Sequence, residues 1–445
     1  MTPSAREGDR IFAPATQIEY MLRFEAALAR ADAAVGWIPN EAADAIATTC
    51  LEIGEFDPGA LERDALHAGT IAIPLIQQLI ARVPVEARPY VHWGATSQDV
   101  MDTALVLQMR DTLDRLLPNL VDIGDALATL ADTHRATVMP GRTLLQQAVP
   151  VTFGLKAARW LGSVGRQKAA LRQLRGEALV LQFGGAAGTL ASLGTRGLEV
   201  ATALASELKL PLPDLSWHAE RDRLTAVVAA LGVTAGVIAK IARDLVLMAQ
   251  TEVAELNERV TPGKGTSSAM PQKRNPVDAI QAIASAQLAI GAVPVVMTAM
   301  AQEHERGAGG WQAEWTAIPD ACRHTMRAAA HLRVAISGLD VHRDRMRVNL
   351  EEGSGAIMAE SLTTALATEV GRAEAMRLTT VVVERAFRDQ MTLPDAARAD
   401  TTVASLLTPE RLEQAFDPTR YLGVTDQLID RALRSWRRTR GPLSQ

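Results

Sequence analysis

Apolar residues recur at helical spacing along most of the chain. Between positions 17 and 36 (QIEYMLRFEAALARADAAVG) they fall on one helical face, and the helix is expected to end at Gly36. A second apolar stripe covers 102–135, where Pro118 predicts a kink. The stretch 221–259 lacks proline and predicts the longest helix, of roughly 50–60 Å at about 1.5 Å per residue. Long helices are therefore expected to dominate the structure.

Strand patterns are weak by comparison. No alternation of apolar and polar residues is long enough to indicate a sheet, and candidates such as 149–153 (VPVTF) are too short to build one. Helical patterns return over 360–389, and shorter pieces rich in arginine follow over 394–445. These patterns predict an all-α fold. Because 221–259 is apolar on more than one face, they also indicate a central bundle of long helices shared between the subunits of a homo-oligomer.

The uncharged stretch 279–302 is long enough to span a bilayer. Alanine is its commonest residue, it also contains glutamine, serine, threonine and proline, and charged segments flank both of its ends. We interpret it as a helix buried in the bundle core and expect no membrane span. Residues 1–10 carry several charges with no apolar run behind them, which predicts no secretory signal and a cytoplasmic protein.

The composition narrows the possible folds and partners of the protein further. Of the 445 residues, 48% are hydrophobic and only 4% aromatic, which suits a large helical core. The 46 basic and 51 acidic residues leave a net charge of −5, so no global positive field is expected to attract nucleic acid or a membrane. An anionic partner must therefore be held by a local site. Cys50 and Cys322 lie far apart in apolar helical segments, which predicts two buried thiols and no disulfide.

Polar loops interrupt the helices and are the candidate site, because loops on a rigid scaffold commonly carry function. The loops are 90–99 (YVHWGATSQD), 141–154 (GRTLLQQAVPVTFG) and 261–276 (TPGKGTSSAMPQKRNP). In the first, Thr96 and Ser97 before Asp99 are also typical of a helix N-cap, whose free N–H groups can themselves bind a carboxylate. A fourth loop, 182–188 (QFGGAAG), is rich in glycine but has no ionisable group.

Metal and cofactor motifs are absent from the sequence. The eight histidines form neither His-x3-His nor His-Glu-x2-His, and no Gly-x-Gly-x2-Gly follows a strand. The sequence has neither the phosphate-binding order Gly-x4-Gly-Lys-Ser/Thr nor a Gly-x-Ser-x-Gly elbow. We therefore expect no metal and no cofactor.

The run GTSSAMPQKRNP (265–276) is very similar to the signature of the fumarase/aspartase superfamily, usually Gly-Ser-Ser-x-Met-Pro-x-Lys-x-Asn-Pro. The runs 94–99 and 143–154 resemble two other motif regions of that superfamily, in the same order. The resemblance covers nearly the whole chain, and Thr266 departs from it where glycine is usual. It implies a three-domain fold with boundaries at 1–105, 106–345 and 346–445, and a homotetramer whose site is built from three subunits.

The resemblance also implies a chemistry. Members of the superfamily transfer a proton at the carbon α to a carboxylate, through an aci-carboxylate dianion. By resemblance, Ser267 is the acid/base, and Lys273 with Asn275 stabilises the dianion. Fixed cations and donors suit that role, because a dianion gains more from them than the singly charged ground state does. Lys273 and Arg274 would also supply the nearby cations that a serine base needs.

Three further runs resemble the cycloisomerase branch of the superfamily, which closes a lactone ring within a tricarboxylate substrate. They are FEAALARAD (24–32), VHWGATSQD (91–99) and GGWQAEW (309–315). The nucleophile of that ring closure is an ionised carboxylate, which needs no base, so one acid/base suffices. The expected substrate-binding residues are His92, Thr96, Ser97, Thr143, Gln146, Gln250, Ser268 and Arg306. Trp311 and Trp315 either line the pocket or belong to the core.

Two alternatives stay open. The first is an amine-releasing lyase of the same superfamily, similar to adenylosuccinate lyase. That enzyme has a histidine acid in its second loop, whereas 144–147 reads Leu-Leu-Gln-Gln here, and its phosphate-binding serine and arginine fall near Trp311 and Trp315. The second alternative is a non-enzymatic oligomeric scaffold, which the retained catalytic signature argues against.

Overall fold

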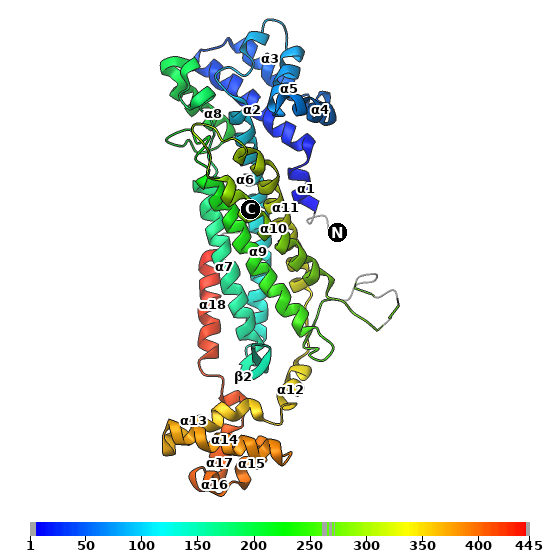
Figure 1. Ribbon diagram of the computed structural model, residues 1–445, viewed down its shortest axis with the longest axis vertical. Helices are drawn as coiled ribbons and strands as arrows, with labels where there is room; N and C mark the ends of the chain where they lie inside the picture. The colour runs from blue at the N-terminus through cyan, green and yellow to red at the C-terminus, as the bar shows by residue number, and fades with distance from the viewer. Residues whose placement is uncertain (1–5, 260–264, 267–268, 271, 442–445) are drawn as a thin grey trace. The chain divides into compact units, whose positions relative to one another are not determined.

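The computed structural model describes residues 6–259, 265–266, 269–270 and 272–441, and most of them are helical (Figure 1). The helices are α1 Glu7–Ile11, α2 Pro14–Val35, α3 Asn40–Cys50, α4 Pro58–Ala68, α5 Ala72–Arg82, α6 Ser97–Thr133, α7 Phe153–Glu177, α8 Gly197–Leu208, α9 Asp222–Met248, α10 Val277–Ala299, α11 Gly310–Ser337, α12 Arg343–Glu351, α13 Ala359–Val370, α14 Arg372–Arg388, α15 Leu393–Ala399, α16 Thr401–Leu406, α17 Pro409–Ala415 and α18 Thr425–Arg440. Short 3₁₀ helices are η2 Ile53–Glu55, η3 Arg88–Tyr90, η4 Gly185–Ala187, η5 Ala191–Arg196, η6 Ala356–Met358 and η7 Pro418–Arg420. The strands are β1 Val138–Thr143, β2 Gln146–Thr152, β3 Leu256–Asn257 and β4 Asp340–Val341.

The described residues form two compact units. Unit 1 takes its residues from 1–120, 167–240 and 281–332, and unit 2 takes them from 121–166, 241–280 and 333–445. The limits of the units fall inside long helices. The three-domain boundaries at 105 and 345 stay a prediction.

In unit 1, helix α2 confirms the first predicted helix. Its predicted stripe is buried, with Ile18, Met21 and Phe24 fully covered. The helix ends where the sequence predicts, because Gly36 adopts a left-handed conformation (φ +81°) and its N–H returns to the last turn. The buried stripe explains how this helix packs against its neighbours α3 and α8.

The long helices of unit 1 pack closely along their lengths (Figure 1). Arg175 on α7 pairs with Asp114 on α6. A Cβ at Gly232 on α9 would lie 2.5 Å from the side chain of Val293 on α10, so only glycine allows this approach. Apolar residues of α6, such as Leu107, are fully buried. The predicted bundle of long helices is confirmed.

Helix α6, with 37 residues, is the longest helix of the described chain, and the prediction that 221–259 holds this place is wrong. Helix α9 ends at Met248 because the chain then turns, with Ala254 at φ +49°. The next residues pair as β3 with β4, and the N–H of Glu255 bonds to the carbonyl of Met248. Pro118 lies inside α6, which continues through it.

A β-hairpin is present where no sheet was expected. Strands β1 and β2 pair antiparallel, with Met139 opposite Val151. Pro140 lies opposite Pro150 in this register, and two prolines break the alternation that a strand prediction needs. The prediction that 149–153 is too short to build a sheet is therefore wrong, because pairing with β1 gives a two-stranded sheet.

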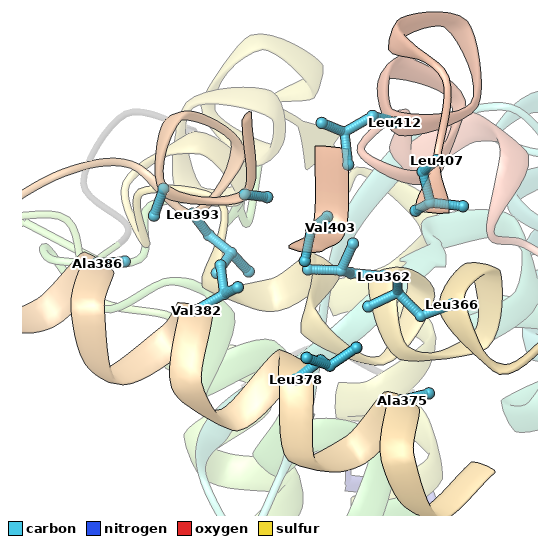
Figure 2. Packing of buried hydrophobic residues seen from close by; sticks show 12 residues of the cluster. Leu362, Leu366, Ala375, Leu378, Val382, Ala386, Leu393, Val403, Leu407 and Leu412 are labelled. Atoms are coloured by element: carbon cyan, nitrogen blue, oxygen red, sulfur yellow. The ribbon is translucent and has the colours of Figure 1, made fainter. Parts of the chain in front are cut away.

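In unit 2, the C-terminal helices surround a small apolar core. Figure 2 shows Leu362 and Leu366 of α13 facing Leu378 and Val382 of α14, with Val403 of α16 above them. The predicted helical region 360–389 contains two helices, α13 and α14, and Gly371 separates them with φ +78°. Only a residue without a Cβ adopts that angle freely, so the break follows from this glycine.

The apolar helix α10 is only partly covered within the chain. Leu288 is 56% exposed and Met297 53% exposed, so one chain alone does not cover this helix, and its burial in a bundle core shared between subunits stays a prediction. Helices α9 and α10 both have the length and apolar composition of a membrane span, and more than half of the apolar stretch of α9 is buried inside the protein. Core helices of oligomers have the same composition, since another subunit covers them. The two cysteines are buried free thiols, as predicted.

Candidate active site

The first candidate loop ends at the start of helix α6. The helix begins at Ser97, which puts Thr96 at the N-cap as the sequence predicts. The side chain of Asp99 returns to the N-cap and accepts a hydrogen bond from Thr96 N at 3.0 Å. The loop is thereby fixed, and the first N–H groups of a 37-residue helix lie directly behind it.

Asp99 also ties the glycine loop 182–188 to this helix start. Its carboxylate accepts hydrogen bonds from Gly184 N at 3.0 Å and Gly185 N at 2.9 Å. It accepts another from Gln182 Nε2 at 3.4 Å and lies 2.7 Å from His218 Nε2. Asp99 and His218 are both buried, so this carboxylate is fully used in joining three segments of unit 1.

Arg306 joins the same two loops from a third segment. Its Nη2 donates to Thr96 Oγ1 at 2.9 Å, to Gly185 O at 3.0 Å and to Ala186 O at 2.9 Å. Its Nε donates to Ala186 O at 3.1 Å. The structure thus brings the predicted residues Thr96 and Arg306 together, and two nitrogens of the guanidinium hold the loops in place.

His92 occupies an unusual place in the first loop. Its backbone lies in the left-handed region, at φ +60°. Its Nδ1 lies 2.7 Å from Oε1 of Glu25, whose side chain is only 1% exposed. Burial opposes the charged imidazolium, but the charge and hydrogen bond of Glu25 and the charge of Asp99 outweigh it, so the pKa of His92 is raised.

A buried charge cluster lies beneath these loops in unit 1. Arg221 donates to Asp102 Oδ2 at 2.6 Å and to Glu314 Oε1 at 3.1 Å. The indole of Trp311 donates to Asp102 Oδ1 at 3.0 Å and packs edge-on against Trp315, with ring centroids 5.0 Å apart. Trp311 is buried and Trp315 partly buried, and both line a cavity of unit 1 together with Gln17.

The second candidate loop is the tip of the β-hairpin in unit 2. Thr143 and Gln146 are exposed and face each other across a two-residue turn. The hairpin is anchored next to its tip, because Arg142 makes two hydrogen bonds of 2.9 and 2.8 Å to the buried carboxylate of Glu255. Gln250 is exposed just after the end of α9.

The third candidate loop is closed by its asparagine. Asn275 donates to Gly265 O from its backbone N at 3.0 Å and from its Nδ2 at 3.3 Å. Gly265 has φ +71°, and a Cβ there would lie 2.7 Å from Asn275 O, so this contact requires glycine. Thr266 and Arg274 pair as a β-bridge, and Lys273, the residue before Arg274, is exposed.

Ser267 and Ser268 lie outside the described residues. Within the part of the chain that the structure describes, no group of three or more His, Cys, Asp or Glu is placed to hold a metal ion. The described residues of the first loop, in unit 1, therefore offer hydroxyls, cations and backbone N–H groups. Those of the second and third loops, in unit 2, offer hydroxyl, amide and ammonium groups. Groups of these kinds bind anions.

The structure adds residues that the sequence analysis missed. Glu25 lies in the run 24–32 that resembles the cycloisomerase branch, but that run gave it no role, and His218 lies in no motif. Only the fold brings the two residues to His92 and Asp99. The glycine loop 182–188 carried a signal, its Gly-Gly doublet, but lacked the ionisable groups that would have marked it as a site. Its contribution is backbone, which composition does not reveal.

Comparison with known proteins shows a consistent likeness. The chain matches the family described as "Lyase" over residues 6–291 and that described as "Adenylosuccinate lyase C-terminus" over residues 355–432. It is 46% identical to the 3-carboxy-cis,cis-muconate cycloisomerase of Bradyrhizobium diazoefficiens over 424 residues, 95% of this chain and 94% of that protein. The enzyme of the same name from Pseudomonas aeruginosa is 43% identical, over 95% of this chain and 93% of its own. The crystal structure of the 3-carboxy-cis,cis-muconate lactonizing enzyme from Pseudomonas putida superposes with a TM-score of 0.91 at 41% identity, covering 99% of this chain and 98% of that one.

Proposed function

Because the chain belongs to the lyase family, within the fumarase/aspartase superfamily that its loops predict, we propose that it is an intramolecular lyase. Its reaction is the lactonisation of 3-carboxy-cis,cis-muconate to 4-carboxymuconolactone, in the catabolism of protocatechuate. The observation that carries this proposal is the 46% identity, over 95% of the chain, to an enzyme named for that substrate.

The chemistry needs one proton and one stabilised dianion. A carboxylate oxygen of the substrate attacks a carbon of its own double bond, and a C–O bond forms. The electron pair of the double bond moves onto the neighbouring carboxylate as an aci-carboxylate. Ser267 then protonates the carbon α to that carboxylate, and its own proton is replaced from solvent. Lys273 and Asn275 stabilise the dianion, which has more charge than the ground state and so gains more from them.

The described loops suit a substrate with three carboxylates. Thr96 and Ser97 present a hydroxyl pair at the N-terminus of α6, where the helix dipole favours an anion. His92, with its raised pKa, supplies a cation in the same loop. Thr143 and Gln146 at the hairpin tip, with Ser268, Gln250 and Arg306, complete the proposed binding set.

The second loop supports a ring closure over amine release. Leu144 and Leu145 occupy the hairpin turn and are exposed, so the turn offers a leaving amine no proton donor. A lactonising enzyme does not need this second proton donor. The nucleophile of the forward reaction is also the leaving group of the reverse reaction, and it is a carboxylate that is ionised at neutral pH. An amine-releasing lyase would need a second acid.

The proposed assembly is a homotetramer, with each site built from loops of three subunits. The exposed apolar side chains of α10 support it, since a second copy of the chain is the partner that family resemblance predicts. Two free buried thiols and no disulfide are consistent with a reducing compartment, and we place the protein in the cytoplasm.

A product assay tests the proposed function. The purified protein is mixed with 3-carboxymuconate, and the loss of the conjugated diene absorbance is followed while the lactone is identified by NMR. Adenylosuccinate in a parallel reaction tests the amine-releasing alternative. Turnover of adenylosuccinate alone would refute the cycloisomerase, and turnover of neither substrate would favour the oligomeric scaffold.

A further inference from the structure

We propose that Glu25 is a positioning residue, which holds His92 as a fixed cation for a carboxylate group of the substrate. The proposal rests on the proposed function for the identity of that substrate. Glu25 lies on α2, far in sequence from the candidate loops, and it acts through the imidazole without touching the substrate itself.

The contact between the two side chains is short and almost free of solvent. Glu25 Oε1 lies 2.7 Å from His92 Nδ1, and the two side chains are 1% and 16% exposed. The bond directs Nδ1 into the protein, so Nε2 at the other side of the ring is the nitrogen available to a ligand. A carboxylate bonded to one ring nitrogen of a histidine fixes the orientation of the ring and keeps a proton on that nitrogen.

The backbone of His92 gives an independent reason to assign it a role. A left-handed φ of +60° is uncommon for a residue with a side chain and persists only where the surroundings enforce it. Gly94, two residues later, is also left-handed at φ +81°, and a Cβ there would lie 2.8 Å from Leu193. The loop is thus held in a conformation that aims the imidazole back at Glu25, four residues before the Thr96 N-cap.

The charges around the imidazole favour its protonated form. Glu25 from α2 and Asp99 from α6 both act on it, against the effect of burial. Asp32 lies two helical turns beyond Glu25 on the same helix. Its burial, and then the charge of Glu25, raise the pKa of Asp32 to about 8. Asp32 is therefore mostly neutral at pH 7, and Glu25 is the carboxylate whose charge the imidazolium balances.

A fixed cation beside a helix N-terminus provides binding without proton transfer. Both features attract the same ligand group, a carboxylate, and both are set before the substrate arrives. The role differs from that of Ser267, which moves a proton. Loss of the cation is therefore expected to raise KM far more than it lowers kcat.

The direct test is the titration of His92 by NMR in the full oligomer without substrate. Histidine labelled with ¹³C at Cε1 gives one signal per residue, and His92→Gln assigns the signal. The midpoint for His92 is expected above the ordinary value of about 6.5. Glu25→Gln is expected to lower the His92 midpoint, and Glu25→Asp is expected to restore part of the loss. Asp32→Asn is the matched control on the same helix, and it is expected to change the midpoint less than Glu25→Gln does.

Kinetics with 3-carboxymuconate give the second readout. In Glu25→Gln, KM is expected to rise roughly tenfold with kcat within a factor of about two, as for the loss of one charge-assisted contact. The alkaline limb of kcat/KM is expected to move to lower pH, since the cation is lost as pH rises through a lower pKa.

The outcomes separate this proposal from the proposed function. A wild-type midpoint at or below 6.5 overturns the role of Glu25 even if Glu25→Gln does not fold. Equal effects of Glu25→Gln and Asp32→Asn overturn it as well. If the wild-type protein fails to convert 3-carboxymuconate while the His92 midpoint is high, the proposed function fails, whereas the hold of Glu25 on His92 stands.

Discussion

At the scale of single residues, the most unusual group is the buried carboxyl of Asp32. It is fully buried, and neither of its oxygens has a hydrogen-bond partner in the described structure. Burial, and then the neighbouring charge of Glu25, raise its pKa to about 8. The native state therefore keeps a proton that the unfolded chain releases near pH 4.

This carboxyl sets a slope of stability with pH. Its contribution is fully present below about pH 4 and is lost as pH rises through the folded pKa of about 8, at roughly 1.4 kcal/mol per pH unit in between. Asp32→Asn removes the titration, so the variant is expected to gain stability relative to wild type as pH rises from 5 to 8. Urea unfolding at a series of pH values measures the difference, and a difference that does not change with pH would contradict it.

The proposed acid/base is tested at the same scale. Ser267→Ala is expected to lower turnover by roughly 10²–10⁴, the usual value of a positioned acid/base, with the oligomer intact. Ser405→Ala, an exposed serine on α16, is the matched control and is expected to keep wild-type turnover. Near-normal turnover in Ser267→Ala would remove Ser267 from its role.

At the scale of elements, the glycine loop is the part of the site that most depends on close packing. A Cβ at Gly184 would lie 2.7 Å from Ser216 Cβ and 2.9 Å from His218 Cε1. Gly184→Ala is therefore expected to push the loop off Asp99 and to lower kcat/KM roughly 10- to 100-fold, as for a displacement of about 1 Å. Gly176→Ala on α7, where nothing lies within 4 Å, is the control, and equal losses in both would refute the packing argument.

Elements differ in how far the sequence could predict them. Helix α2 was predictable because its apolar residues recur at helical spacing and Gly36 marks its end. The end of α9 at Met248 was not, because its cause is the pairing of β3 with β4, a contact between segments far apart in the chain. The hairpin was missed for the same reason. Pro140 and Pro150 interrupt the strand pattern within each segment, and only the pairing of the two segments forms the sheet.

The site shows the same division. The three loops were predictable from their motifs, and the structure confirms that Thr96 caps α6 and meets Arg306. The supporting roles of Glu25 and His218 were not predictable, because the run 24–32 assigns Glu25 no partner and His218 lies in no motif. Each acts through a side chain that only the fold brings near its partner. Long-range contacts, in contrast to local spacing, leave no trace in a single sequence.

At the scale of the whole molecule, α10 indicates a missing neighbour. Its apolar side chains point in several directions, and one chain covers only some of them. Leu288, Val295 and Met297 stay exposed, at a cost in free energy that another subunit would remove. The proposed tetramer turns this exposed face into a core shared by copies of the same helix.

A charge on that face tests the assembly. Leu288→Glu is expected to convert the oligomer to monomer at micromolar concentration, because a buried unpaired carboxylate costs about 3–5 kcal/mol, or a factor of roughly 10²–10⁴ in the dissociation constant. Light scattering after gel filtration distinguishes a particle of four times the 47.7-kDa chain from the chain alone. Leu66→Glu, at an exposed leucine on α4, is the control and is expected to leave the particle mass unchanged.

Since each site is proposed to draw loops from three subunits, the Leu288→Glu monomer is also expected to lose turnover. A wild-type protein that is already monomeric at micromolar concentration, or a Leu288→Glu monomer with full turnover, would contradict the shared core and the shared site.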